Sequence, residues 1–155
     1  MLFRSQGDEP LVHCEMVDLM AKAMLEDKSL VMATVVKVMT DESEVANPNV
    51  VKVVLDKDGN ALYFSRSPIP YNREKQPFSK IRYYKHFGLY AYRKNFLMQF
   101  KGLPVSLLED AEKLEQLRVL EAGYRIKVVQ TKFDTVAVDT QEDLERVRDL
   151  IKKRN

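Results

Sequence analysis

The spacing of apolar residues predicts a helix followed by a buried strand near the start of the chain. Between residues 11 and 27 apolar side chains recur at helical spacing, and the opposite face is polar. The apolar positions are Val12, Met16, Leu19, Met20 and Ala23. The run from residue 30 to residue 38 is apolar and rich in β-branched side chains, as is typical of a strand inside a sheet.

Two further runs predict a hairpin. Residues 50–55 and 61–66 are rich in strand-forming side chains, and they flank a turn of polar residues that contains Gly59. Lys52 and Arg66 lie on these two strands. Because lysine and arginine on strands usually extend into solvent, the pattern predicts that both side chains are solvated.

The next segment, residues 67–80, contains three prolines and predicts an ordered loop that suits a lid or a subunit contact. Its expected anchors are Ile69, Tyr71 and Phe78. An aromatic strand follows over residues 81–92, and its alternation places His86, Gly88, Tyr90 and Tyr92 on one face. His86 beside Gly88 on this face is consistent with a ligand-facing histidine and equally with a structural, hydrogen-bonded one.

The last third of the chain predicts helices around one more strand. Residues 95–100 form a short helix, and Ser106 with Glu109 has the capping-box pattern of a helix that runs to Ala122. A strand over residues 124–131 and a final helix after Thr140 complete the order. This succession indicates an α/β fold with a mixed sheet flanked by helices.

Composition narrows the possible classes of protein. The 155 residues suit one domain, and the net charge of +2 comes from interspersed acids and bases, which argues against a nucleic acid or an anionic membrane as partner. A single cysteine excludes an internal disulfide. No apolar run approaches a membrane span, and the first residues lack the apolar core of a signal peptide, so we expect a cytoplasmic protein.

The stretch Gln6-Gly7-Asp8-Glu9-Pro10 predicts a strand end, a turn and the start of a helix. Carboxylates there would lie at the carboxyl edge of a sheet, where open α/β folds bind ligands and where a carboxylate suits magnesium. The alternative is a plain helix cap. A strand must precede such a site, so either residues 1–5 form a very short strand or the chain lacks sequence in front of them.

Several stretches, in this order and at compatible spacing, resemble the bacterial sugar-activating cytidylyltransferases, specifically the 3-deoxy-manno-octulosonate (Kdo) cytidylyltransferases. The stretches are Gln6–Pro10, Asn47–Val54, Ala61–Arg66, Pro68–Pro70, His86–Arg93, Leu114–Arg118 and Val138–Leu144. The resemblance implies magnesium-dependent transfer of CMP from CTP to Kdo, with release of pyrophosphate, for lipopolysaccharide synthesis. It also implies a homodimer, with residues 50–80 as the expected contact surface.

The resemblance also assigns roles to individual residues. Asp8 and Asp139 are the implied catalytic carboxylates and magnesium ligands. Arg66 is expected to pair with the sugar carboxylate, and His86 and Tyr90 to contact hydroxyls. The implied sugar-binding residues are Gln6, Arg66, His86, Tyr90, Glu109 and Gln116.

The family's N-terminal nucleotide-binding half has no counterpart in these residues. The expected fold is therefore a partial Rossmann-like nucleotidyltransferase fold, with residues 1–155 as a single domain that forms the C-terminal sugar-binding and dimerisation part. We expect this part alone to be weakly active or inactive, because the cations that stabilise the leaving pyrophosphate are absent. The alternatives are a catalytically inactive fragment that only binds Kdo or dimerises, and an acylneuraminate-type cytidylyltransferase. The stretches at 61–70 and 114–118 favour Kdo.

Overall fold

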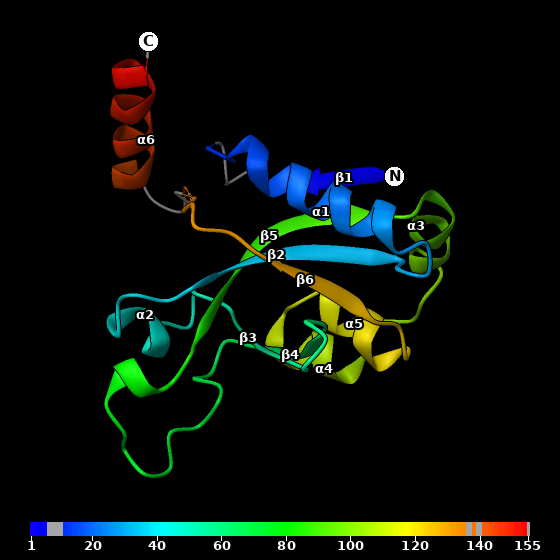
Figure 1. Cartoon of the computed structure of the whole chain (residues 1–155), viewed down its shortest axis with the longest axis horizontal. Coiled ribbons are helices and arrows are strands. Elements are labelled where there is room, and N and C mark those ends of the chain that lie inside the picture. Colours follow the sequence, from blue (N-terminus) through cyan, green and yellow to red (C-terminus); the bar gives the residue numbers. More distant parts are fainter. Residues whose placement is uncertain (6–10, 136–137, 139–140, 155) are drawn as a thin grey trace.

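A computed structural model describes residues 1–5, 11–135, 138 and 141–154. Within these residues the strands form a six-stranded mixed sheet in the order β4-β3-β5-β2-β6, with β1 also paired to β5 (Figure 1). The strands are β1 (Leu2–Ser5), β2 (Met32–Val38), β3 (Lys52–Leu55), β4 (Ala61–Ser65), β5 (Tyr84–Tyr92) and β6 (Ile126–Gln130). The α/β fold with a mixed sheet is therefore confirmed.

Helices cover both faces of this sheet (Figure 1). The helices of the described residues are α1 (Cys14–Glu26), α2 (Ser43–Ala46), α3 (Lys94–Phe100), α4 (Leu107–Glu112), α5 (Gln116–Glu121) and α6 (Gln141–Arg154), with a 3-10 turn, η1, at Phe78–Lys80. On one face Met16, Met20 and Met24 of α1 are buried against β2 and β5. Among the described residues, no helix has the length and apolar character needed to cross a membrane.

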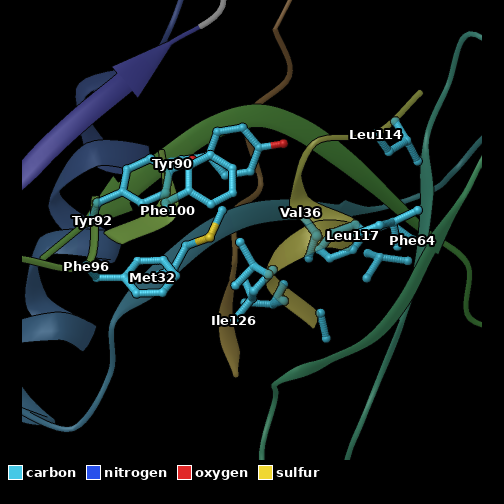
Figure 2. Close-up of a cluster of buried hydrophobic side chains, with 14 residues drawn as sticks. Met32, Val36, Phe64, Tyr90, Tyr92, Phe96, Phe100, Leu114, Leu117 and Ile126 are labelled. Carbon is cyan, nitrogen blue, oxygen red and sulfur yellow. The ribbon is translucent and has the colours of Figure 1, made fainter. Parts of the chain in front are cut away.

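The opposite face of the sheet carries the larger core, which β-strand residues share with α3 and α5. Tyr90 and Tyr92 lie beside Phe96 and Phe100 at one end of this cluster (Figure 2). At the other end Phe64 and Leu117 lie near Val36 and Leu114 (Figure 2). Alternation along β5 thus divides its side chains between the two cores, as the sequence pattern predicts.

The two edges of β5 are paired differently. Along one edge β2 pairs with β5 from Tyr84 to Tyr92. On the other edge β1 pairs with Leu89–Tyr92, whereas β3 pairs only with Lys85. Because β1 and β3 both run antiparallel to β5, β1 ends close to where β3 begins. We call this place, with residues 86–89 of β5 at its centre, the sheet split. Residues 1–5 therefore supply the very short strand.

The predicted single helix from residue 106 to Ala122 is wrong. Lys113 adopts a left-handed backbone with φ 54° and separates α4 from α5. The Glu112 carboxylate accepts hydrogen bonds from the Ser65 hydroxyl (2.6 Å) and the Arg66 backbone N–H (2.9 Å). The break thus lets the end of α4 bind the end of β4, while Leu117 of α5 is buried in the core.

The prediction of solvated side chains on the hairpin is also wrong for Lys52. Its residue exposure is 0%, and its ammonium donates to the carbonyl oxygens of Asn47 (2.9 Å), Val50 (2.7 Å) and Arg66. Burial lowers the pKa of the Lys52 ammonium below its ordinary value. The sequence pattern misses this because the lysine stem lies among apolar strand residues while its charge is satisfied by backbone carbonyls.

Tyr71 does not anchor the proline-containing loop, because it is 84% exposed. The anchor is Phe78, which packs parallel to Tyr83 at 6.1 Å between ring centroids and joins a small cluster with Met39 and Val45. The rest of the loop extends away from the sheet (Figure 1). Its base is therefore fixed at Phe78, while Tyr71 is exposed to solvent.

Candidate functional site

The sheet split is the candidate site, because open α/β sheets bind ligands beyond the carboxyl ends of their strands, and β1 ends there opposite Leu89. The amide of His86 still donates to the carbonyl of Val51, just before β3 (2.9 Å). Three residues later Leu89 is opposite Ser5, the last residue of β1. The β5 residues between these two pairs therefore lie between the end of β1 and the start of β3.

A bulge in β5 lies at this place. Thr34 of β2 is opposite Tyr90, but the next residue, Val35, is opposite Phe87, so that Gly88 and Leu89 are extra residues on β5. Bulges bend a strand and redirect a side chain, and they occur often next to functional sites. Here the bulge separates the two sequence-predicted residues His86 and Tyr90, yet their rings remain 5.6 Å apart between centroids.

His86 is buried and uncharged. Its Nε2 lies 2.8 Å from the Thr34 hydroxyl, and its ring meets the edge of Phe64 at 4.8 Å between centroids. Desolvation lowers the pKa of His86 to about 3, so the imidazole is neutral at physiological pH. The structure therefore confirms that His86 is hydrogen-bonded within the fold and places it at the sheet split, and its contact with a ligand stays a prediction.

Tyr90 lies opposite Arg4 of β1 and is buried. Arg4 forms an ion pair of 2.6 Å with Glu115, which brings the start of α5 to this part of the sheet. The next residue, Gln116, is 3% exposed, and its side-chain amide makes no hydrogen bond with the described residues. Because buried amides are nearly always paired, Gln116 is a candidate for binding a further polar group.

Arg66 follows the end of β4 at the same level of the sheet, since Ser65 is paired with Lys52 and Lys52 with Lys85. Its Nε donates to the Glu112 carbonyl and its Nη1 to the Pro48 carbonyl, both at 2.9 Å. Nη2 makes no hydrogen bond with the described residues. The guanidinium is thus held in place by backbone oxygens, and Nη2 remains to donate to a carboxylate.

Glu109 is placed differently from the other predicted site residues. Its carboxylate accepts from Nε and Nη2 of Arg118 at 2.6 and 2.5 Å, and this pairing holds the pKa of Glu109 below its usual range. Arg118 in turn lies over the Phe100 ring at 5.2 Å. The observed contacts of Glu109 therefore join α4 to α5, and they do not connect it to His86 or Arg66.

The remaining predicted site residues, Gln6, Asp8 and Asp139, lie outside the described residues. Within the described ranges, no three His, Cys, Asp or Glu side chains are grouped to hold a metal ion. The strands that precede the two aspartates, β1 and β6, both run parallel to β2, because β1 and β2 are each antiparallel to β5. Their carboxyl ends therefore point to the same edge of the sheet.

Comparison with known proteins shows the family of the chain. The sequence model of the family described as "Cytidylyltransferase" matches residues 1–133. The chain belongs to the cytidylyltransferase family. A 3-deoxy-manno-octulosonate cytidylyltransferase from Solibacter usitatus is 48% identical over 147 residues, which cover 95% of this chain and 58% of that relative. Another from Geotalea uraniireducens is 50% identical, with coverage of 96% and 62%.

A solved structure shares the fold of this cytidylyltransferase-family chain. It is a CMP:2-keto-3-deoxy-manno-octonic acid synthetase complexed with CTP, with a TM-score of 0.90 and 42% identity. The match covers 99% of this chain and 62% of that protein. The chain thus spans about three fifths of the length of the relatives it matches, as the coverages of 58% and 62% show.

Sequence reasoning misses three residues that organise this site in the cytidylyltransferase chain. The Lys52 ammonium donates to the Arg66 carbonyl, and Glu112 accepts hydrogen bonds from the backbone N–H and the guanidinium Nε of Arg66. Thr34 binds His86 and the bulge of β5. The only sequence signal is a polar residue between apolar neighbours, at Thr34 between Ala33 and Val35 and at Lys52 between valines. Glu112 has no such signal, because its partners are 46 and 47 positions away.

Proposed function

We propose that this chain takes part in the magnesium-dependent transfer of CMP from CTP to 3-deoxy-D-manno-octulosonate (Kdo), with release of pyrophosphate. The names of the relatives support the reaction, and the solved synthetase with CTP supports the nucleotide substrate. The sugar site rests on the observation that His86 and Tyr90 lie in ring contact at the sheet split, and that Gln116 is buried while its side-chain amide makes no hydrogen bond with the described residues. Such a group of polar side chains beside an aromatic core suits a hydroxylated ligand.

In this proposal Arg66 binds the carboxylate of the sugar acid through Nη2. Its other N–H groups stay on backbone carbonyls, so the guanidinium is already oriented before the sugar arrives. His86 and Tyr90 contact hydroxyls. A neutral imidazole is suited to this because it can accept a hydrogen bond at one ring nitrogen while the other donates.

Asp8 and Asp139 are the proposed magnesium ligands. The donor chemistry fits, because carboxylate oxygens are the protein ligands that magnesium prefers. The common edge at which β1 and β6 end supports a shared position for the two segments. When bound there, magnesium would neutralise phosphate charge and orient the triphosphate. The chain's own residues would hold the sugar acid so that its anomeric hydroxyl faces the α-phosphorus.

The proposal extends to the setting of the reaction. CMP-Kdo is the activated sugar for lipopolysaccharide synthesis, and we place the reaction in the cytoplasm. A homodimer is proposed through residues 50–80, and the exposed Tyr71 on the extended loop supports this surface. Glu109 is retained in the sugar-binding set as the residue that positions Arg118 and the start of α5 near the site.

Pyrophosphate release from CTP in the presence of Kdo and magnesium tests the transfer. Because we expect this part alone to be weakly active or inactive, any release should be slow, require Kdo, stop when the metal is chelated, and be lost in Asp139→Ala. An activity that is equal with and without Kdo would contradict the proposal. A folded chain that binds Kdo but releases no pyrophosphate would instead support the alternative, a fragment that only binds the sugar. Stronger turnover of N-acetylneuraminate than of Kdo would assign the other sugar acid.

A further inference from the structure

Thr34 occupies a position that no requirement of strand packing explains. It lies in the centre of β2 between apolar neighbours and is fully buried, with 0% exposure. Its hydroxyl sits in the β5 bulge, 2.7 Å from the Leu89 carbonyl, 3.4 Å from the Phe87 carbonyl and 2.8 Å from His86 Nε2. A valine would have the same shape, so the hydroxyl itself needs an account.

The proton count of this cluster fixes the state of His86. A threonine hydroxyl has a single proton, and the Leu89 carbonyl can only accept it. At 2.7 Å the bond to Leu89 is much shorter than the one to Phe87, so the proton points to Leu89. The Thr34 oxygen must then accept from His86, which means that Nε2 carries the ring proton.

The neutral imidazole has one N–H, so protonation at Nε2 leaves Nδ1 as a bare acceptor. Nδ1 makes no hydrogen bond with the described residues. The opposite tautomer would place two lone pairs, on Nε2 and on the Leu89 carbonyl, in competition for the one Thr34 proton. In a buried site such an unmade hydrogen bond is costly, so the Thr34–Leu89 pair selects one tautomer.

We propose that Thr34 is a positioning residue that holds His86 in the Nε2–H tautomer and so presents Nδ1 as an acceptor for a hydroxyl of the sugar acid. This inference rests on the proposed function for the identity of the ligand, whereas the control of the tautomer is a property of the chain alone. Thr34 touches no reacting atom. Its role is to set the direction of the hydrogen bond that His86 offers.

The test uses the variants Thr34→Val, which removes the hydroxyl but keeps the shape, and Thr34→Ser, which restores the hydroxyl. Nitrogen-15 NMR of the side-chain imidazoles reports which ring nitrogen carries the proton, and a His13→Gln variant assigns the second histidine. We expect the Nε2–H tautomer in the wild-type chain and in Thr34→Ser, and a mixture of tautomers in Thr34→Val. Affinity for Kdo should fall by about 2- to 10-fold in Thr34→Val, as for one neutral hydrogen bond, and recover in Thr34→Ser.

A proton on Nδ1 in the wild-type chain overturns the inference, and this measurement needs no variant to fold. An unchanged tautomer in folded Thr34→Val overturns it as well, because the hydroxyl would then serve only the bulge carbonyls. If the spectra follow the expectation but the wild-type chain does not bind Kdo, the control of His86 by Thr34 stands and the proposed sugar site fails. The two ideas are thus separated by the same set of samples.

Discussion

At the scale of single residues, the chain uses buried polar groups to orient others. The Lys52 ammonium binds three backbone carbonyls, one of them that of Arg66, and Glu112 binds the Arg66 amide. A buried ammonium without partners would be very unfavourable, so its three acceptors are a condition for its presence. Arg66 is consequently held from both sides before any ligand binds.

The buried histidine predicts how stability depends on pH. The unfolded chain protonates His86 near pH 6.5, whereas the folded chain resists protonation down to about pH 3. Below pH 6.5 the unfolded state therefore binds more protons, and the free energy of unfolding falls as the pH decreases. The slope from this residue approaches about 1.4 kcal/mol per pH unit, and it vanishes above about pH 7.

Urea unfolding between about pH 5 and 6.5 measures this slope with little interference from carboxyl groups, which titrate at lower pH. We expect His86→Gln to have a clearly smaller slope than the wild-type chain, whatever its absolute stability. His13 is present in both proteins and cancels in the comparison. Equal slopes would mean that His86 is protonated as easily in the folded chain as in the unfolded one.

At the scale of elements, local patterns predict most of the fold. Helix α1, strand β2, the β3–β4 hairpin and the two faces of β5 follow from apolar spacing and turn residues, because each is decided by neighbours within a few positions. The break between α4 and α5 is not predictable in this way. Its cause is the contact of Glu112 with Ser65 and Arg66, which only the folded chain brings together.

The break between α4 and α5 predicts that the chain is more stable with glycine than with alanine at position 113. Its left-handed backbone, with φ 54°, is costly for any residue with a Cβ and free of that cost for glycine. We expect Lys113→Gly to be more stable than Lys113→Ala by about 1 kcal/mol. Both variants lose the same exposed ion pair with Asp110, so the alanine protein is the matched control.

Thermal or urea unfolding of the two variants decides this point. A glycine protein that is equal to or less stable than the alanine protein would show that the chain continues helically through residue 113. In that case α4 and α5 would be one helix, and Glu112 would not reach β4.

At the scale of the whole molecule, the sequence resemblance and the structure contribute different parts of the account. The resemblance predicts the family, which the match over residues 1–133 confirms. It also predicts that Arg66, His86, Tyr90 and Gln116 share a site. In the structure β1 and β3 divide one edge of β5, and the start of α5 reaches β1 through Arg4 and Glu115. A site shared by the four residues stays a prediction.

Spacing alone cannot predict that arrangement, because it depends on which strand pairs with which edge. Periodicity places His86 and Tyr90 on one face of β5, but it contains no information about the bulge at Gly88 and Leu89 or about Thr34. For the same reason, the ion pair of Glu109 with Arg118 is visible only in the structure. Asp8 and Asp139 remain predictions from the resemblance.

Binding of Kdo at the sheet split is the central claim, and titration calorimetry of the folded chain with Kdo tests it most directly. Arg66→Gln removes the proposed partner of the sugar carboxylate, and Arg73→Gln removes the same charge from an exposed position on the loop. We predict that Kdo binds the wild-type and Arg73→Gln chains equally and that Arg66→Gln binds it about 10- to 100-fold more weakly, as expected for a charge-assisted hydrogen bond. Equal affinity of all three chains, or no binding by the folded wild-type chain, would contradict the account.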